Sequence, residues 1–261
     1  MYNVGITSME KLSLIIPAYN EEVNIRKTLT AIIPLLNRKA IPCEVIVVND
    51  NSTDTTQSVV ENIQKDYPEI RLVNRGAPNG FGRAIRAGLE VYTGDIVVIV
   101  MADLSDDPND IVRYYNVIRE GYDCVFGSRF MRGSKTSNYP FVKLVVNRLV
   151  NRMLQVLFVT RFNDITNAFK MYRSTVIQSI LPLRASYFNI TIELSLSALI
   201  RRYRIAQIPI NWYGRTWGCS NLKLSEMGRR YLATLIKIWA ERTFILDDLL
   251  EEDSTKKHQT P

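Results

Sequence analysis

The segment Leu12-Ser-Leu-Ile-Ile-Pro-Ala-Tyr-Asn-Glu-Glu22 joins an apolar run to a polar turn at the point where helical spacing begins. An apolar run bounded by turn residues is typical of a buried strand, so we predict a strand over 12–18. Asn20 is a residue type that favours a helix N-cap, and the stretch from Glu21 to Leu36 has the spacing of a helix. The segment therefore predicts a strand–turn–helix unit with polar residues at the end of the strand.

The same alternation continues through the first half of the chain. Further strands are expected at Cys43–Val48, Ile70–Val73, Asp95–Met101 and Tyr122–Phe126, and further helices at Asp54–Asp66, at Gly80–Tyr92 and after Asp107-Pro108. This β-α-β-α order implies a parallel, doubly wound sheet, in which ligands bind outside the carboxyl ends of the strands. Polar clusters follow four of the strands, at Tyr19-Asn-Glu21, Asn49-Asp-Asn51, Asp103-Leu-Ser105 and Ser128-Arg129.

Two amphipathic helices are expected in the second half of the chain. The first covers about 141–159, and its polar positions form one basic stripe that begins at Lys143 and contains no acid. Such a helix suits an anionic membrane surface, but a core helix with a solvated stripe has the same pattern, and the pattern alone favours neither. The second helix covers Leu222–Leu246 and carries a row of apolar residues on one face.

The composition of the 261 residues excludes several kinds of chemistry. Lys and Arg number 33 against 26 Asp and Glu, so the net charge is +7, which favours an anionic partner such as a nucleotide or a phospholipid headgroup. The one histidine, His258, lies in a polar tail, so neither a Ser-His-Asp triad nor a histidine zinc site is expected. The three cysteines form no CxxC pair, and neither a signal peptide nor a transmembrane helix is expected. The basic residues form no motif that reads nucleic acid.

Three motifs at the ends of predicted strands together carry a family resemblance: Ile16-Pro-Ala-Tyr-Asn-Glu-Glu22, Val47-Val-Asn-Asp-Asn-Ser-Thr-Asp54 and Val100-Met-Ala-Asp103. With them, about residues 11–225 resemble the inverting glycosyltransferases of family two, and most of all the dolichol-phosphate mannose synthases and related polyprenyl-phosphate sugar transferases. The resemblance implies an α/β fold of the GT-A type, a Rossmann-like doubly wound mixed sheet with C-terminal amphipathic interface helices. It also implies a nucleotide-sugar donor.

The resemblance assigns the donor side of the site. The residues that answer to the donor pocket are Pro17, Tyr19, Glu21, Asp50, Gly80, Asp103, Arg215 and Ser220. Tyr19 supplies an aromatic wall and Asp50 an acceptor for a base N–H group. A divalent cation, Mg²⁺ or Mn²⁺, is implied at Asp103 and Ser105, because the leaving diphosphate must be neutralised and these ions prefer oxygen ligands.

The metal motif departs from the family pattern. The usual Asp-x-Asp reads Met101-Ala-Asp103, so its first carboxylate is absent, and Asn49 replaces the first acid of Asp-Asp-Gly-Ser. Asp106 is a possible replacement carboxylate, whereas Asp107, directly before a proline, is expected to be the N-cap of the next helix.

The acceptor side is assigned by the second half of the resemblance. Gly127-Ser-Arg129 matches the family's Gly-Ser/Thr-Arg, and Arg129, Lys143 and Asn147 fall where relatives contact an acceptor phosphate. Asp164, in a segment that resembles Asp-Leu-Thr-Gly-Ser-Phe-Arg-Leu-Tyr-Arg, closes the far side of the site. The residues expected to carry catalysis are Asp103, Arg129, Asp164 and Arg215. Glu193 holds the family's acid position in the next segment.

A phosphate acceptor also fits the lack of a usable histidine. A sugar hydroxyl needs a general base, whereas a phosphate monoester is already largely dianionic near neutral pH. The expected reaction is therefore transfer of a hexose, with inversion, from a GDP-mannose or UDP-glucose type of donor to a polyprenyl or dolichyl phosphate. Asp164 and Glu193 remain possible bases for a hydroxyl acceptor.

The expected organisation follows from this function. We assign a glycosyltransferase domain to residues 11–225, a C-terminal amphipathic helix to 226–250 and a polar tail to 251–261. The protein is expected on the cytoplasmic face of a membrane, either attached peripherally or held there by a small membrane subunit. Three alternatives are a family-two enzyme that extends a glycan or polysaccharide, a sugar-1-phosphate nucleotidyltransferase, and a binding subunit without activity.

Overall fold

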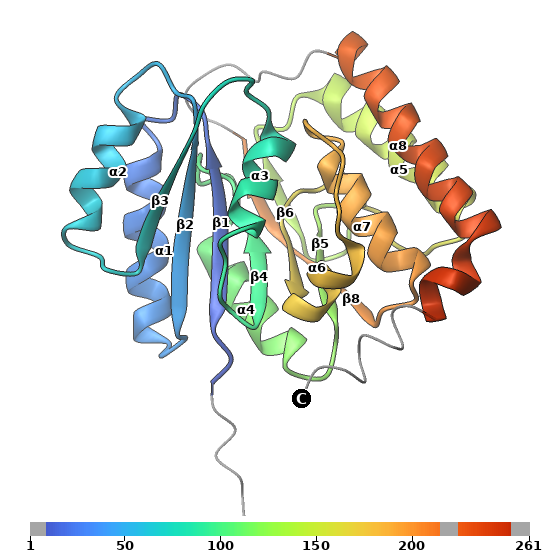
Figure 1. Cartoon of the computed structure of the whole chain (residues 1–261), viewed down its shortest axis with the longest axis horizontal. Coiled ribbons are helices and arrows are strands. Elements are labelled where there is room, and N and C mark those ends of the chain that lie inside the picture. Colours follow the sequence, from blue (N-terminus) through green and yellow to red (C-terminus); the bar gives the residue numbers. More distant parts are fainter. Residues whose placement is uncertain (1–8, 215–223, 252–261) are drawn as a thin grey trace, which may run out of the picture.

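The computed structural model describes residues 9–214 and 224–251, which form one mixed sheet with helices on both faces (Figure 1). The strands are β1 (Leu12–Ala18), β2 (Cys43–Asp50), β3 (Ile70–Arg75), β4 (Ile96–Ile99), β5 (Cys124–Ser128), β6 (Lys135–Ser137), β7 (Lys170–Arg173), β8 (Ile205–Pro209) and β9 (Asn211–Tyr213). The helices are α1 (Ile25–Arg38), α2 (Thr56–Gln64), α3 (Phe81–Leu89), α4 (Pro108–Ile118), α5 (Phe141–Phe158), α6 (Ser174–Ile180), α7 (Ile190–Ile200) and α8 (Leu224–Phe244). All five strands predicted in the first half are confirmed.

The strand order of the main sheet is β3-β2-β1-β4-β7-β5-β8. The pairs among β1 to β4 and the pair β5–β8 are parallel, as predicted from the alternation of strands and helices. Strand β7, which comes from the second half of the chain, lies antiparallel between β4 and β5 and makes the sheet mixed. The mixed sheet is the one implied by the family resemblance. A short parallel pair, β6 with β9, stands apart from the main sheet.

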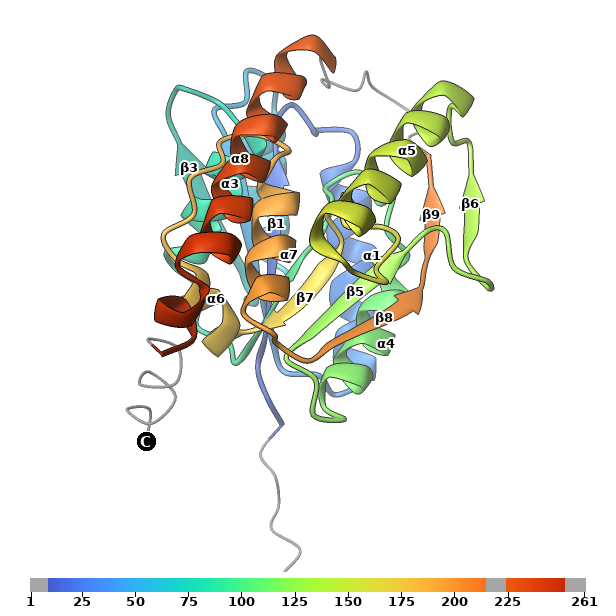
Figure 2. The ribbon, with the colours of Figure 1, turned by 90° about the vertical axis from the view of Figure 1, so that its right-hand side faces the viewer.

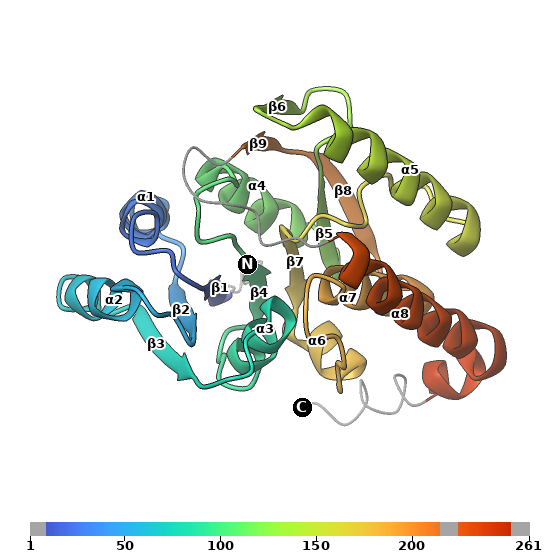
Figure 3. The same cartoon turned by 90° about the horizontal axis from the view of Figure 1, so that it is seen from above.

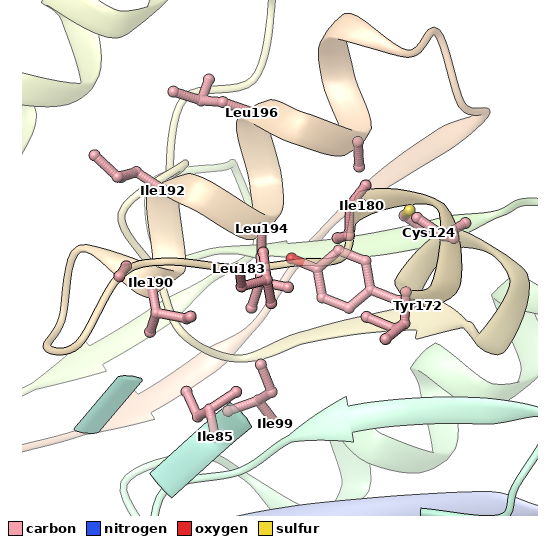
Figure 4. Packing of buried hydrophobic residues seen from close by; sticks show 14 of the residues in the cluster. Ile85, Ile99, Cys124, Tyr172, Ile180, Leu183, Ile190, Ile192, Leu194 and Leu196 are labelled. Atoms are coloured by element: carbon pink, nitrogen blue, oxygen red, sulfur yellow. The ribbon is translucent and has the colours of Figure 1, made fainter. Parts of the chain in front are cut away.

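The strands are apolar throughout because helices cover both of their faces. Every residue of β1 is buried, and its side chains alternate between two clusters. Ile15 packs with residues of α3, α6 and α7, whereas Leu14 and Ile16 pack with residues of α1 and α4. Figure 3 shows these two helical layers from above the sheet. Figure 4 shows the first cluster, where Tyr172 of β7 lies among Ile180, Leu183 and Leu194.

The N-terminus of α4 is as predicted from the sequence, whereas that of α1 is not. Helix α4 begins as predicted, with the side chain of Asp107 accepting a hydrogen bond from the backbone N–H of Asn109 at 2.9 Å. Helix α1 begins at Ile25, later than predicted, and Asn20 is not its N-cap. Asn20 instead has a φ of 54°, in the left-handed region that asparagine tolerates, and its side chain accepts a hydrogen bond from Thr53 N at 2.8 Å. The turn after β1 is therefore fastened to the turn after β2.

The two amphipathic helices lie on the same side of the molecule, beyond β5 and β8 (Figures 2 and 3). Helix α5 buries Leu154 and Phe158 in the core. Many of its other apolar side chains face outward, which the alternative of an ordinary core helix does not explain. Among the described residues, no helix is long and apolar enough to cross a bilayer.

The start of α3 is held against the segment before α7 at a glycine. The N–H of Gly82 donates to Ser186 O at 3.1 Å, and a Cβ at this position would lie 2.5 Å from Ala185 O and 2.9 Å from Tyr187 O. Those carbonyls belong to the backbone, so they cannot rotate away as a side chain does.

We expect Gly82→Ala to lower the free energy of unfolding by about 1–3 kcal/mol, the usual cost of overpacking. Gly76→Ala is the matched control, because a Cβ at Gly76 meets nothing within 4 Å. Chemical denaturation of both variants measures the effect. Equal stabilities would contradict the close approach described at Gly82.

Candidate active site

The predicted donor residues lie at the carboxyl edge of the sheet, where β1 has β2 on one side and β4 on the other. This is the place where the strand order reverses, and open α/β sheets bind ligands there. Pro17 is buried in β1, Tyr19 directly after it is exposed, and Glu21 is buried, with its carboxylate accepting from Asn24 Nδ2 at 2.8 Å. The N–H of Glu21 donates to Thr56 Oγ1 at 2.8 Å, so this turn is fixed to the start of α2.

Asp50, the last residue of β2, is buried and holds two neighbouring segments. One carboxylate oxygen accepts a hydrogen bond from the guanidinium of Arg75, and the other accepts from the N–H of Gly80 at 2.6 Å. Arg75 was not predicted from the sequence, because the pairing of β2 with β3 that sets it opposite Asp50 is a tertiary contact. Any ligand contact of Asp50 is made by a carboxylate that already has these two donors.

Asp103 follows β4 in a tight turn. Its carboxylate accepts from the N–H of Ser105 at 3.1 Å, and Leu104 between them has a φ of 56°, which is rare for a bulky residue. Such strain persists only where the surroundings impose it, and it concentrates at functional sites. Ser105 itself is buried, and its carbonyl accepts from Tyr213 N at 2.9 Å.

Asp106, the possible replacement carboxylate, lies in the same turn as Asp103. It is buried, and its carboxylate accepts from the N–H of Met101 at 3.2 Å. Burial, with the negative charge of Asp103 next, raises the pKa of Asp106 to about 7. The Asp106 carboxylate therefore joins the two ends of the segment 101–106 through its hydrogen bond with Met101.

The residues present allow a divalent cation with few protein ligands. Among the described residues, no three His, Cys, Asp or Glu side chains are grouped as a metal site. Mg²⁺ is commonly held by only one or two carboxylates together with substrate phosphates and waters. Asp103, at the end of β4, is a carboxylate that suits this arrangement.

Arg129 and Asp164 form a bidentate ion pair at the end of β5. Arg129 Nε donates to Asp164 Oδ2 at 2.8 Å and Nη2 donates to Oδ1 at 2.7 Å, and the backbone N–H of Arg129 donates to the same carboxylate at 3.0 Å. Burial disfavours the charged guanidinium, but the adjacent Asp164 outweighs it and raises the pKa of Arg129. The structure therefore brings the two predicted residues together, and each is the ion-pair partner of the other.

Polar side chains of α5 and the 164–167 loop extend this pair. Arg129 Nη1 donates to the hydroxyl of Tyr139 at 3.3 Å, and Asn147 Nδ2 donates to the same hydroxyl at 2.6 Å. Thr166 Oγ1 in turn donates to Asn147 Oδ1 at 2.6 Å. Of the other predicted acceptor residues, Lys143 is exposed on the first turn of α5.

Lys170 is a functional candidate that the sequence analysis missed. It is 1% exposed, and its Nζ donates to Ile165 O at 2.5 Å, to Asn167 O at 2.6 Å and to Ser195 Oγ at 2.6 Å. Lys170 thus holds the loop that presents Asp164. Its place in the Asp164–Arg173 segment was the available signal, although a lysine in a sequence usually lies on the surface.

The remaining predicted residues are placed as follows. Glu193 accepts from the backbone N–H groups of Arg184 and Ala185 and from Lys237 Nζ at 2.8 Å, so it orders the segment before α7. Gly80 precedes α3 as described above. Arg215 and Ser220 lie outside the described residues.

The sheet order, the antiparallel β7 and the carboxylates after β2 and β4 define a Rossmann-like α/β domain of the GT-A type. Residues 13–181 match the model of the family "Glycosyl transferase family 2". This match spans more than half of the chain, and the chain therefore belongs to glycosyl transferase family 2. The predicted resemblance and the predicted enzyme class are confirmed.

Two relatives with names agree with this assignment. A dolichol-phosphate mannosyltransferase of Pyrococcus furiosus is 27% identical over 82% of this chain, which spans 59% of that relative's length. A polyprenol monophosphomannose synthase of Mycolicibacterium smegmatis is 26% identical, over 84% of this chain and 83% of the relative. Among solved structures, glucosyl-3-phosphoglycerate synthase of Mycobacterium tuberculosis has a TM-score of 0.68 and 22% identity, over 88% of this chain and 80% of that one. The last likeness supports the fold.

The buried amine of Lys170 generates a pH-dependent prediction. Burial lowers its pKa from 10.5 to about 7 in the folded protein. The unfolded chain then binds more protons than the folded one between pH 7 and 10.5, so this group's contribution to stability rises with pH in that window. Above pH 7, we expect the unfolding free energy of the wild type to rise relative to that of Lys170→Met, by up to about 1.4 kcal/mol per pH unit.

Denaturant titrations at several pH values from 6 to 9 test this expectation, with Lys65→Met, a substitution of an exposed lysine, as the control. A difference that stays constant for Lys170→Met would mean that the three oxygen acceptors keep the amine protonated throughout.

Proposed function

We propose that this protein transfers a hexose, with inversion, from a GDP-mannose or UDP-glucose type of donor to a polyprenyl or dolichyl phosphate. The names of the two relatives support a lipid-phosphate acceptor. The observation that carries the proposal is the outward apolar face of α5 and α8, next to the site. The donor half is common to many family members, so the second half must decide the acceptor.

Both helices expose large apolar side chains. On α5, Phe141, Leu149 and Val156 are exposed by 70% or more of their surface. On α8, Leu232 and Ile236 are more than half exposed. A contiguous exposed apolar surface with basic residues beside it is the pattern of a helix that lies in a membrane interface. The proposed location is the cytoplasmic face of a membrane, reached directly or through a small membrane subunit.

On the donor side, we assign the nucleotide to the carboxyl ends of β1 and β2, with contacts to Tyr19, Asp50 and Gly80. The predicted contacts of Arg215 and Ser220 with the donor phosphates belong to the same proposal. A divalent cation, Mg²⁺ or Mn²⁺, held through Asp103 with Ser105 beside it, would neutralise the leaving diphosphate.

On the acceptor side, the proposal needs no general base. Both oxygens of Asp164 accept hydrogen bonds from Arg129, which favours a positioning role for this carboxylate. A phosphate dianion needs orientation and screening of its charge. We assign these tasks to Arg129, held in place by Asp164, to the amide of Asn147, and to Lys143 at the start of the membrane-facing helix.

We expect Leu149→Asp combined with Val156→Asp to reduce binding to vesicles that contain anionic phospholipid by about tenfold or more, because two charges would enter the apolar interface. Both side chains are exposed, so the fold should be unchanged. The matched control, Thr30→Asp with Asn62→Asp, adds the same charge on exposed positions of α1 and α2. Equal vesicle binding by the two double variants would remove the membrane face from the proposal.

We expect Asp103→Asn to lower turnover by about 100-fold or more while the protein stays folded, since one charged group at the leaving diphosphate is lost. The assay follows radiolabel from a panel of GDP- and UDP-sugars into the organic phase with polyprenyl phosphate and Mg²⁺ or Mn²⁺. Asp66→Asn, an exposed carboxylate of the α2–β3 connection, is the control. Label that enters a soluble glycan instead of the lipid would favour the alternative of a glycan-extending enzyme.

A further inference from the structure

A chain of hydrogen bonds leads from the backbone before β7 to the acceptor side of the site, and the backbone fixes its direction. The N–H groups of Ile165 and Thr166 can only donate, and both donate to Asn151 Oδ1, at 2.6 and 3.3 Å. The other end of that amide is therefore a donor, and Asn151 Nδ2 donates to Thr166 Oγ1 at 2.9 Å. The Thr166 hydroxyl accepts this bond and donates its own hydrogen to Asn147 Oδ1 at 2.6 Å.

The chain ends at the hydroxyl of Tyr139, a half-buried residue ahead of α5. Because Asn147 Oδ1 already accepts from Thr166, its Nδ2 faces this hydroxyl and donates to it at 2.6 Å. Arg129 Nη1, which also can only donate, contributes a second hydrogen bond at 3.3 Å. Within the part of the chain that the structure describes, the Tyr139 hydroxyl accepts these two bonds and donates none. Its own hydrogen is therefore available to a ligand.

The ring of Tyr139 is fixed from two sides. It packs against Trp212 of β9 with ring centroids 4.8 Å apart, and the guanidinium of Arg129 lies 5.5 Å from its centroid. Trp212 in turn forms an antiparallel backbone bridge with Asp106, in the turn after β4. The hydroxyl is thus set on a frame that joins the turn after β4 to the end of β5. A side chain that is ordered beforehand loses less entropy when a ligand binds.

We propose that the Tyr139 hydroxyl donates a hydrogen bond to the phosphate of the acceptor, as a further acceptor residue beside Arg129 and Asn147. This inference rests on the proposed function and narrows its acceptor. The oxygens of a phosphate dianion only accept hydrogen bonds, so they match a hydroxyl that has only its hydrogen left to give. A sugar hydroxyl has to give up its proton during transfer, and the phenol oxygen already accepts from two groups. The donor at Tyr139 therefore favours a phosphate acceptor.

The substitution Tyr139→Phe tests the proposal, because it removes the hydroxyl and keeps the ring that packs on Trp212. Binding is measured first, without a nucleotide-sugar, by calorimetric titration of farnesyl phosphate in detergent micelles. Farnesol is the probe that lacks the phosphate. Steady-state transfer to polyprenyl phosphate then gives kcat and the KM of each substrate. The matched control is Tyr67→Phe, the same substitution at another half-buried tyrosine, in the α2–β3 connection.

We expect Tyr139→Phe to bind farnesyl phosphate about tenfold more weakly than the wild type, because a hydrogen bond to a charged group is lost. Its binding of farnesol should be unchanged, which also shows that the variant is folded. The KM for polyprenyl phosphate should rise by a similar factor, with kcat within about threefold of the wild type and the KM for the nucleotide-sugar unchanged. Tyr67→Phe should match the wild type in every measurement.

Three results would overturn the proposal. The first is that Tyr139→Phe binds farnesyl phosphate as tightly as Tyr67→Phe does. The second is a rise in the KM for the nucleotide-sugar instead, which would assign the hydroxyl to the donor. The third is a fall in kcat with both KM values unchanged, as expected if Tyr139 only holds Arg129 in position.

Failure of the proposed function gives a different result, which is seen in the wild type alone. A wild type that neither binds farnesyl phosphate nor transfers label to lipid would overturn the proposed function and this inference with it. A wild type that does both, beside an unaffected Tyr139→Phe, would overturn only the role of Tyr139.

Discussion

The buried ion pair of Arg129 and Asp164 is the interaction on which the second half of this structure depends. Two charges removed from water are costly, and they are stable only when their hydrogen bonds are satisfied. Here the carboxylate accepts three hydrogen bonds from Arg129 alone. The pair ties the end of β5 to the loop that leads into β7, and so it fixes where the antiparallel strand enters an otherwise parallel sheet.

The loop that carries Asp164 is also held by Lys170 and by helix α5. Lys170 donates to two of its carbonyls, and Asn151 of α5 accepts from the N–H of Ile165 at 2.6 Å. A loop fastened by a buried lysine, a buried amide and an ion pair has few alternative conformations. The same contacts hold α5 against the loop, because Asn147 and Asn151 of that helix both hydrogen-bond with Thr166. The orientation of the outward apolar face therefore follows from the site.

The first half of the fold was predictable because its signals are local. Each strand of the parallel part is an apolar run that ends in a polar turn, and the carboxyl-edge rule then places Asp50 and Asp103 on one edge without further information. Asn20 was predicted wrongly as an N-cap because its side chain is used in a contact with Thr53, which the sequence does not reveal. Arg75 was missed for the same reason.

The second half was less predictable, since its key contacts join distant residues. Four residues of β7 are too few for a clear strand pattern, and a buried lysine at position 170 contradicts the usual expectation for that residue type. The family resemblance supplied Arg129 and Asp164 but not their pairing.

Under the proposed function, the pairing of Arg129 with Asp164 determines how the charge of an acceptor phosphate would be neutralised. An arginine matched by a buried carboxylate has a formal net charge of zero with its partner, so it orients a phosphate through its donors without adding attraction at a distance. Net attraction has to come from cations that lack a matching acid nearby. Lys143 lies on the basic stripe of α5 and is exposed. Under the proposed function, exposed cations such as Lys143 would therefore draw a phosphate toward the protein, and Arg129, already matched by Asp164, would align it for reaction.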